Sequence, residues 1–508
     1  MTAVWQRGWF WWLLAIVSTL PFVIAPLPMM PDFFSHMGRY HVMNHGAQSP
    51  FLPRYYHFQW RLMGNLGVDL LMVPLGHWLP TETAARIAAA IIPPLTIAGI
   101  YAVGTAAWGR IQAPALLALP FVYSYSFLFG FVNYHLALAL ALLVLALWMR
   151  STAIGLPRRW LVFAPLATIV WVAHMAGWGV LVVAIACHEL AAVRQPGHRL
   201  AAAVARLLPL LVPLLLVLMW RNDATEAAFS PEWDHKLLWL WNLLRAEWQV
   251  FDLACLAVLL LLAVALLVAA ATRRLSPLRP AAGVGAMPAV LLAAAVLFGC
   301  FLVLPNAVFG SYYADQRMLA PAAILYFLAF GAPAGRALGA SHARWATLVA
   351  AIGVTIFTLR IAETSLGWYQ RGGAAVADLQ ALDHVPRGAR IAVAATPSDC
   401  GSWPLTGLDH LASLAIIRRE AFVDTEWDMA GALLMQPIYN LDLDANDEQD
   451  VLLAAPDCPE EQDLSDLLAD LPRHRMDFVW IFGSGQPGVP WLHLVDQGPH
   501  GRLYRIVR

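Results

Sequence analysis

The chain has 508 residues, of which 60% are hydrophobic and 13% are charged, and its mean hydropathy is +0.62. These values lie outside the range of soluble globular proteins and indicate a membrane protein. The net charge of −1 hides an asymmetry, because 11 of the 33 acidic residues lie in residues 1–362 and 22 lie in the last 146 residues. We therefore expect a multi-pass transmembrane domain over 1–362 and a water-facing domain over 363–508.

Apolar runs long enough to cross a bilayer contain about 20 residues. Such runs lie at 9–30, 86–108, 131–149, 250–272, 285–305, 319–337 and 344–362. Shorter apolar segments lie at 112–124, 160–173, 177–190 and 204–220. Together they predict an α-helical polytopic membrane protein with about eleven transmembrane helices.

The arginines predict the orientation of these spans. Cytoplasmic loops are enriched in arginine, and one topology places thirteen arginines on that side, the first being Arg7 and the last Arg344. This topology predicts a protein of the bacterial inner membrane, with the N-terminus in the cytoplasm and the C-terminal domain in the periplasm. The stretch "NLGVDLLMVPLGHWLP" (65–80) must then return to the outer side as a juxtamembrane or re-entrant helix, since the arginine bias breaks if it spans.

A large outer loop (31–80) follows the first span and opens with "MPDFFSHMGRYHVMNHG". A proline suited to a first helical turn and a glycine suited to a helix end predict a helix over 32–45. At about 100° per residue, Asp32, His36 and Arg39 share one face of that helix. A carboxylate beside a cation at a membrane edge is able to take a proton from a substrate hydroxyl while the cation holds a phosphate, although capping and interfacial roles explain the same residues.

Further polar residues are expected at the same outer face. In "NAVFGSYYADQRM" (306–318), Asp315 and Arg317 precede a span, where a charge is costly unless it is paired or lies in a water-filled cavity. They either pair with each other, or Arg317 binds a lipid phosphate through its paired guanidinium donors. Asp69 and His174 are additional candidates for binding substrate or phosphate, with packing or hydrogen bonding as the alternative.

The segment after 362 has the pattern of an α/β domain. Candidate strands are "RIAVAAT" (390–396), "LASLAIIRREAFV" (411–423), "MDFVWIFG" (476–483) and "LYRIVR" (503–508), and "DLSDLLADLP" (463–472) is a candidate helix. Cys400 and Cys458 both lie in this outer domain, where oxidising conditions permit a disulfide.

This layout resembles the GT-C superfamily of membrane glycosyltransferases, which includes polyprenyl-phosphate-sugar-dependent enzymes such as the aminoarabinose transferase of lipid A and the protein mannosyltransferases. In that superfamily the catalytic carboxylate lies in the first outer loop, and its position matches Asp32. The usual D-x-D or E-x-D pairing is absent, because position 34 is Phe. The pattern "PD...H..R" after the first helix, with "ADQR" before a late one, also resembles a set of mostly uncharacterised bacterial multi-pass membrane proteins.

The resemblance implies transfer of a hexosyl or pentosyl group from a polyprenyl-phosphate donor to an envelope acceptor at the outer membrane face. Asp32 would deprotonate the acceptor hydroxyl, and Arg317, Arg39 or a divalent cation (Mg²⁺ or Mn²⁺) would neutralise the departing phosphate. The expected partners are the lipid-linked sugar donor and the lipid bilayer, with no nucleic acid.

Two other classes of protein share several of these features. A transporter or lipid flippase also has many spans and a few intramembrane charges, but transporters usually show two similar halves, and the sequence has no such repeat. A non-catalytic envelope assembly or sensor protein would act mainly through residues 363–508.

Overall fold

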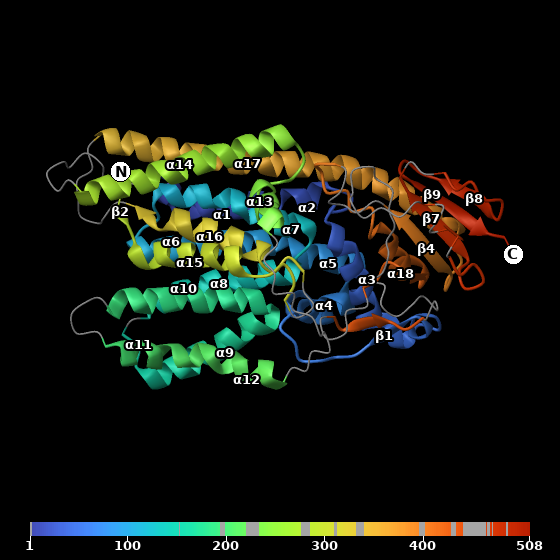
Figure 1. Ribbon diagram of the computed structural model, residues 1–508, viewed down its shortest axis with the longest axis horizontal. Helices are drawn as coiled ribbons and strands as arrows, with labels where there is room; N and C mark the ends of the chain where they lie inside the picture. Colours follow the sequence, from blue (N-terminus) through green and yellow to red (C-terminus); the bar gives the residue numbers. More distant parts are fainter. Residues whose placement is uncertain are drawn as a thin grey trace.

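The computed structural model describes residues 3–151, 153–193, 199–219, 233–275, 285–308, 312–331, 340–395, 402–427, 433–439, 464, 468–469, 471–483 and 486–507. The molecule is elongated, with a bundle of long helices at one end and a β-sheet at the other (Figure 1). The two termini lie at opposite ends, the C-terminus beside the sheet. The structure is mostly helical, with strands concentrated in the C-terminal part of the chain.

The helical bundle contains most of the apolar sequence. Its helices are α1 (Gly8–Val17), α2 (Leu20–Ile24), α6 (Ile92–Trp108), α8 (Val132–Arg150), α9 (Leu156–Ala173), α10 (Met175–Val193), α11 (Leu200–Leu207), α12 (Val212–Met219), α14 (Gln249–Leu275), α15 (Pro288–Val303), α16 (Leu319–Leu328) and α17 (Ala340–Asp378). Shorter helices lie between the bundle and the sheet or at their junction: α3 (Pro31–His45), α4 (Gly67–Trp78), α5 (Thr81–Ala90), α7 (Tyr125–Phe129), α13 (Trp233–Trp241) and α18 (Leu414–Arg419).

Within the described residues, seven helical segments are long and apolar enough to cross a membrane. They are Thr81–Trp108, Val132–Arg150, Leu156–Ala173, Met175–Val193, Leu200–Leu218, Gln249–Thr272 and Ala343–His384, and three shorter apolar helical segments are Gly8–Ile24, Ala113–Phe129 and Pro288–Val303. These helices fit the predicted multi-pass membrane protein. The number of about eleven spans and the orientation stay predictions.

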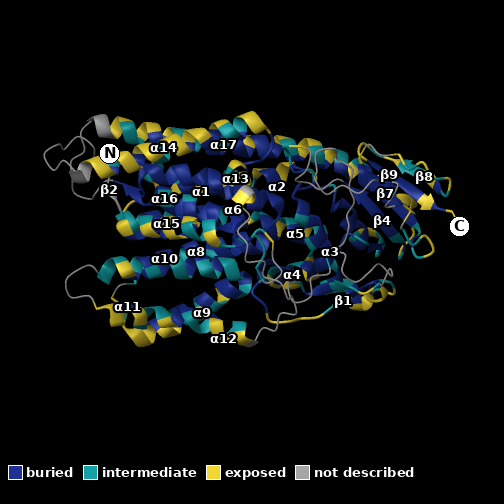
Figure 2. Cartoon of the chain, in the orientation of Figure 1, coloured by how far each residue is buried: buried dark blue, intermediate teal, exposed yellow. Residues whose placement is uncertain are grey.

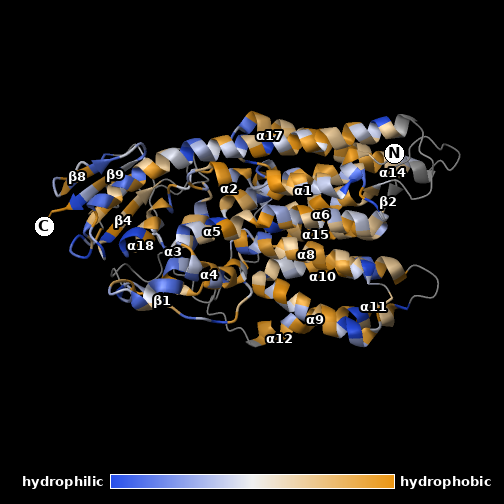
Figure 3. Cartoon of the chain, turned by 180° about the vertical axis from the view of Figure 1, so that it is seen from behind, coloured by the Kyte–Doolittle hydropathy of each residue, from blue (hydrophilic) through white to orange (hydrophobic). Residues whose placement is uncertain are grey.

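Large apolar side chains are exposed on the surface of the bundle. Leu218 on α12 is 81% exposed and Leu261 on α14 is 71% exposed. Exposed positions follow the outward sides of the peripheral helices (Figure 2), and the same helices are predominantly hydrophobic (Figure 3). A contiguous apolar surface of this kind is costly in water and suits contact with lipid.

The centre of the bundle is an unusual element. Residues 113–123 form a long 3-10 helix, η4 (Ala113–Tyr123), which continues through Ser124 into α7, and every residue from 113 to 129 is buried. Pro120 lies inside this helix and lacks the backbone N–H that an α-helical ladder requires there, whereas Pro114 lies in the first turn, where proline is tolerated. Because η4 packs against α6, α16 and α17, this short predicted span lies enclosed by other helices.

The C-terminal part contains a five-stranded mixed sheet with the strand order β5-β4-β7-β9-β8. Strand β4 (Arg390–Ala395) is parallel to both β5 (Phe422–Val423) and β7 (Phe478–Phe482), whereas β9 (Gly501–Ile506) is antiparallel to β7 and to β8 (Leu492–Gln497). The predicted strands at 390–396, 476–483 and 503–508 are confirmed. The α/β character expected after residue 362 therefore holds for the strands that the structure describes.

The prediction of a strand over 411–423 is wrong for most of its length. The segment forms a 3-10 turn, η8 (Leu411–Ser413), then α18, and only its last two residues form β5. A short apolar run does not by itself distinguish a buried strand from a buried helix. Here α18 packs closely against α3. A Cβ atom placed on Gly38 of α3 would lie only 2.9 Å from Cδ1 of Ile416. This packing favours the helix.

The first outer loop and the C-terminal part pack together as one unit. Strand β1 (Tyr56–Phe58) pairs antiparallel with β6 (Met435–Pro437), and α3 contacts η8 and α18. Helix α17 runs without interruption across position 362, so the chain enters its C-terminal part inside a helix. The division at 362/363 stays a prediction.

The two helices predicted in the outer loop are present. Helix α3 begins at Pro31 and is followed by Gly46, as the sequence indicates. Helix α4 covers 12 residues of the stretch 65–80, or about 18 Å at about 1.5 Å per residue, which is short of a span. Its re-entrant or juxtamembrane character remains a prediction. Cys400 and Cys458, the proposed disulfide pair, and half of the residues of the predicted helix 463–472 lie outside the described residues.

Candidate functional site

Helix α3 presents Asp32, His36 and Arg39 on one face, at the level where the bundle meets the C-terminal part (Figure 1). Arg39 is buried and donates from Nε and Nη2 to the two carboxylate oxygens of Asp69, at 3.0 and 3.2 Å. It also donates from Nη1 to Nδ1 of His36 at 3.1 Å. Three of the predicted site residues therefore form one connected group, in which the charge of Arg39 is compensated by Asp69.

Asp69 is held from a third direction by α8. The side-chain amide of Asn133 donates to Asp69 at 3.0 Å, and its oxygen accepts from the backbone N–H of Val68 at 2.6 Å. The same amide group donates to the backbone and side-chain oxygens of Asn65. Because these bonds join α3, α4 and α8 with little solvent exposure, they fix the orientation of the α3 face.

His36 is neutral in this setting. Burial, followed by the neighbouring Arg39 and His410, holds the pKa of His36 well below its usual range. Since its Nδ1 accepts from Arg39, the proton of the neutral ring resides on Nε2. His36 is also partly exposed, so it presents a neutral hydrogen-bond donor on the face that carries Asp32.

Asp32 lies in the first turn of α3 and is half-buried. A negative charge is favourable at this end of a helix. The loop before α8 approaches it closely: a Cβ atom on Gly130, whose φ is +120°, would lie 2.9 Å from the Asp32 Cβ and 3.0 Å from the Phe33 nitrogen. Glycine is thus required at position 130 both by its backbone conformation and by the proximity of Asp32.

Arg317 lies close to Asp32 in space, although 285 positions separate them in the numbering. Its guanidinium stands 4.6 Å from the ring centroid of Phe131, and its carbonyl accepts a short hydrogen bond from the hydroxyl of Tyr134. Burial lowers the pKa of Arg317 to about 10, while Tyr134, Asp32 and Asp315 act in the opposite direction. The side chain remains cationic at neutral pH.

His174 belongs to the Arg317 side of the site. Its ring packs edge-to-face on Tyr134 with centroids 5.6 Å apart, and its Nδ1 accepts from the backbone N–H of Ala176 at 3.0 Å. Arg317 and His135 are its electrostatic neighbours. The structure thus brings His174 and Arg317 around one tyrosine, near the N-terminus of α8.

Asp315 has a different main partner from the one the sequence suggests. It forms a buried ion pair with Lys236, the sole lysine of the chain, whose Nζ also donates to the carbonyl of Leu304 at 2.6 Å. The Lys236 ammonium lies 5.4 Å from the ring centroid of Phe301. Asp315 therefore serves as the counter-ion of a lysine from α13, 79 positions earlier in the chain.

Sequence reasoning missed a group contributed by the C-terminal part. Ser35 of α3 donates to Glu426 at 2.8 Å, and the Trp427 ring lies between the rings of His36 and His410, with centroid distances of 5.6 and 4.6 Å. Burial raises the pKa of Glu426 to about 7. Ser35 projects from the same side of α3 as Asp32, so a second carboxylate stands beside the α3 face.

This region holds buried polar atoms that make no hydrogen bond of good geometry within the described part of the chain. They include the hydroxyls of Tyr40 and Thr425 and one carboxylate oxygen of Glu426. A buried polar atom without a partner is costly, on the order of 1–3 kcal/mol, and such atoms are typical of sites that hold water or ligand. No sequence signal marks this cluster, because its members are about 390 positions apart.

A second buried ion network joins α17 to the start of α14. Arg360 on α17 pairs with Asp252 on α14, and Glu363 accepts from the backbone N–H groups of Glu247 and Trp248 at 3.2 and 2.8 Å. Arg371 pairs with Glu247 through both guanidinium nitrogens. These bonds fasten the start of α14 to α17.

Among the described residues, no three side chains of His, Cys, Asp or Glu come together as metal ligands. His41 and His45 lie next to each other with ring centroids 4.9 Å apart, and His41 hydrogen-bonds to Thr81. A role for Mg²⁺ or Mn²⁺ stays a prediction. Within the same residues, Cys187, Cys255 and Cys300 are free thiols.

No protein-family model, curated protein or solved structure matches this chain.

Proposed function

We propose that the protein is a membrane glycosyltransferase that moves a sugar from a polyprenyl-phosphate donor to an acceptor of the cell envelope, at the outer face of the cytoplasmic membrane. The observation that carries this proposal is the proximity of a partly exposed carboxylate, Asp32, to a buried cation, Arg317. The layout of the sequence, which resembles the GT-C superfamily, supports the same reaction class. The N-terminus would lie in the cytoplasm and the C-terminal sheet outside.

The two cations suggested by the sequence lie in different surroundings. Arg39 is bound bidentately by Asp69, and a third bond connects it to His36. The Arg317 guanidinium lies 4.6 Å from the ring centroid of Phe131, and Asp32 and Asp315 are among its electrostatic neighbours. We assign Arg39 a positioning role because it joins α3 to α4 through Asp69. We assign the donor phosphate to Arg317 because this cation lies near Asp32.

In the proposed step, an acceptor hydroxyl attacks the anomeric carbon of the donor sugar. A carbon–oxygen bond to the acceptor forms, the bond to the polyprenyl phosphate breaks, and the acceptor proton passes to Asp32. The departing phosphate gains negative charge, which the Arg317 guanidinium neutralises through paired donors. With one carboxylate acting as base and none as nucleophile, the configuration at the anomeric carbon inverts.

His36 and Glu426 have supporting roles in this proposal. His36 offers a neutral N–H donor one helical turn from Asp32, and Glu426 lies beside Ser35 on the same face. Neutral donors and partly protonated carboxyls suit the hydroxyl groups of a sugar, which both donate and accept hydrogen bonds. Neither residue transfers the proton in the chemical step.

The test is a comparison of envelope glycolipids, glycans and glycoproteins by mass spectrometry. Cells would carry the intact gene, a deletion, or Asp32→Asn, with the amount of protein in the membrane matched. The matched control is Glu82→Gln, which makes the same carboxylate-to-amide change at a more exposed pair with Arg418.

We expect one glycan mass increment to disappear in the deletion and in Asp32→Asn but not in Glu82→Gln. An unchanged profile in the deletion would exclude the reaction class. A product fully retained in Asp32→Asn would instead exclude Asp32 as the base.

A further inference from the structure

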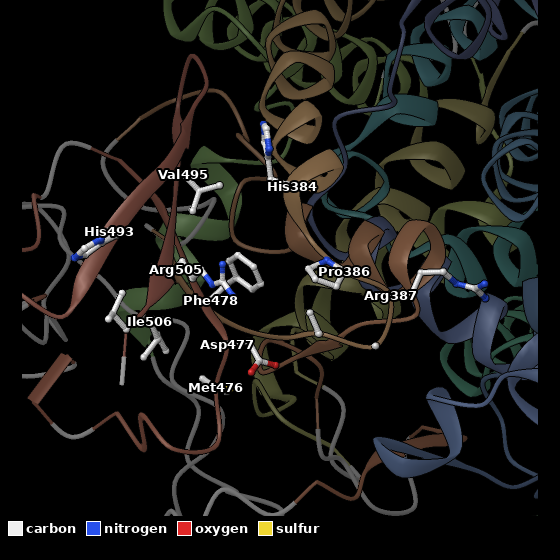
Figure 4. Close-up of a pocket in the computed structure, with 13 residues that line it drawn as sticks. His384, Pro386, Arg387, Met476, Asp477, Phe478, His493, Val495, Arg505 and Ile506 are labelled. Atoms are coloured by element: carbon white, nitrogen blue, oxygen red, sulfur yellow. The ribbon is translucent and has the colours of Figure 1, made fainter.

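A pocket of about 990 Å³ lies in the C-terminal part, away from the α3 site (Figure 4). It is lined by the segment that follows α17, by the first residues of β7, by β8 and by the end of β9. None of the lining residues that the structure describes comes from the first outer loop or from the Arg317 segment. Its volume is at the upper end of the range of about 300–1,000 Å³ that is typical of small-molecule sites.

The strand register places three lining side chains in one row across the sheet. Arg505 of β9 pairs with Phe478 of β7 on one side and with His493 of β8 on the other. Directly paired residues project from the same face of a sheet. Arg505 and His493 are exposed, whereas Phe478 is 5% exposed, so the row changes from apolar to basic across the pocket.

Among the described residues, two of the charged side chains that line the pocket form ion pairs, and a third, Arg505, does not. Asp477 pairs with Arg390 through two bonds of 2.8 and 2.6 Å, and Arg387 pairs with Glu420. Arg505 forms no ion pair with any part of the chain that the structure describes. Figure 4 shows Arg505 and Phe478 in the middle of the pocket, with Pro386 on the opposite wall. The Arg505 guanidinium thus faces a pocket whose lining is part polar and part apolar, with Phe478, Pro386 and Val495 on the apolar side.

We propose that this pocket binds a small organic anion: a carboxylate or phosphate group on Arg505, with the ring or chain that bears it against Phe478 and Pro386. Guanidinium presents paired donors that match either group. The apolar part of the lining, which includes Phe478 and Pro386, favours a ligand with an organic body over an inorganic ion. This site is independent of Asp32 and Arg317, and its ligand is bound without being chemically changed.

The experiment measures binding of phenyl phosphate to the full-length protein in detergent by isothermal titration calorimetry. Inorganic phosphate supplies the charge without the body, and benzyl alcohol supplies the body without the charge. The test variant is Arg505→Gln, and the matched control is Arg502→Gln. Arg502 is on the same strand, but three positions away, so its side chain projects from the opposite face.

We expect saturable binding of phenyl phosphate, in the millimolar range or tighter, and weaker binding of both partial probes. Arg505→Gln should weaken it about tenfold or more, as expected for loss of a charge-assisted hydrogen bond, and Arg502→Gln should leave it unchanged. Equal thermal unfolding midpoints of the two variants without ligand would show that both are folded.

Three results would overturn the proposal. These are absence of saturable binding to the wild-type protein, equal binding by wild-type and Arg505→Gln, or tighter binding of hexaglutamate than of phenyl phosphate at the same residue. The last result would indicate an acidic peptide as the ligand.

Discussion

Replacing Asp69 by asparagine should destabilise the protein more than any comparable change at an exposed ion pair. Asp69 accepts from Arg39 at 3.0 and 3.2 Å and from Asn133 at 3.0 Å, and the side chains of Asp69 and Arg39 are 1% and 4% exposed. Asparagine keeps the shape but leaves Arg39 as a buried charge without compensation. The cost of such a loss is about 3–5 kcal/mol.

The assay is thermal unfolding of the detergent-solubilised protein, followed by the fluorescence of its 22 tryptophans. Glu82→Gln is the control, because Glu82 also accepts two bonds from one arginine, at 2.9 and 3.0 Å, but its side chain is 27% exposed. An exposed pair is worth about 0–1 kcal/mol. The double variant Arg39→Met/Asp69→Leu should recover part of the loss, since it removes both charges.

The reasoning would be refuted if Asp69→Asn and Glu82→Gln unfolded at the same midpoint. It would also be refuted if the double variant were less stable than Asp69→Asn.

Two further predictions concern the surroundings of the same helix face. Burial raises the pKa of Glu426 to about 7 from an ordinary value of 4.5, so the folded state binds its proton more tightly than the unfolded state does. The stability of the wild-type protein should therefore fall as the pH rises through this interval, by about 3 kcal/mol from this group. Glu426→Gln should lack that part of the decrease, and unfolding midpoints of both proteins between about pH 5 and pH 8 would measure the difference; parallel curves would contradict it. Gly130→Ala should lower stability by about 1–3 kcal/mol and reduce the glycan product, because its φ of +120° and its contact with Asp32 both oppose a side chain. Gly179→Ala on α10, where an added Cβ meets no atom within 4 Å, should be tolerated, and equal effects of the two alanines would contradict this account.

The elements that were predictable from the sequence are those with local signals. Helix α3 has a proline in its first turn and a glycine after its last residue, and both bounds follow from these two residues. Strands β4 and β7 are short β-branched and aromatic runs that lie between polar segments. The long apolar helices follow from run length and hydropathy.

The pairings inside the site were not predictable in the same way. Arg39 and Asp69 were both candidates, but nothing within the 30 positions between them indicates that they bind each other. Ser35 and Glu426 are 391 positions apart, and Asp315 and Lys236 are 79 apart. Such contacts depend on how helices pack, and a single sequence carries no local pattern for them.

In the segment 411–423 a local sequence signal was present but predicted the wrong secondary structure. Its β-branched and apolar residues favour a strand locally, yet most of it is η8 and α18, packed against α3. Tertiary packing decides the structure of a short apolar run more strongly than its intrinsic preference does. Because α18 contacts α3, this misassigned segment is also part of what holds the Asp32 face in place.

The most direct test of the proposed chemistry is release of polyprenyl phosphate by the purified protein. The lipid-linked sugar fraction and the envelope acceptors of the source cells would be incubated with wild-type protein, Asp32→Asn or Glu82→Gln, and free polyprenyl phosphate would be quantified by mass spectrometry. Wild-type and Glu82→Gln should release it at similar rates, and Asp32→Asn should be slower by about 10²–10⁴-fold, as expected for loss of a general base. Equal release by Asp32→Asn would contradict the central claim that Asp32 takes the acceptor proton.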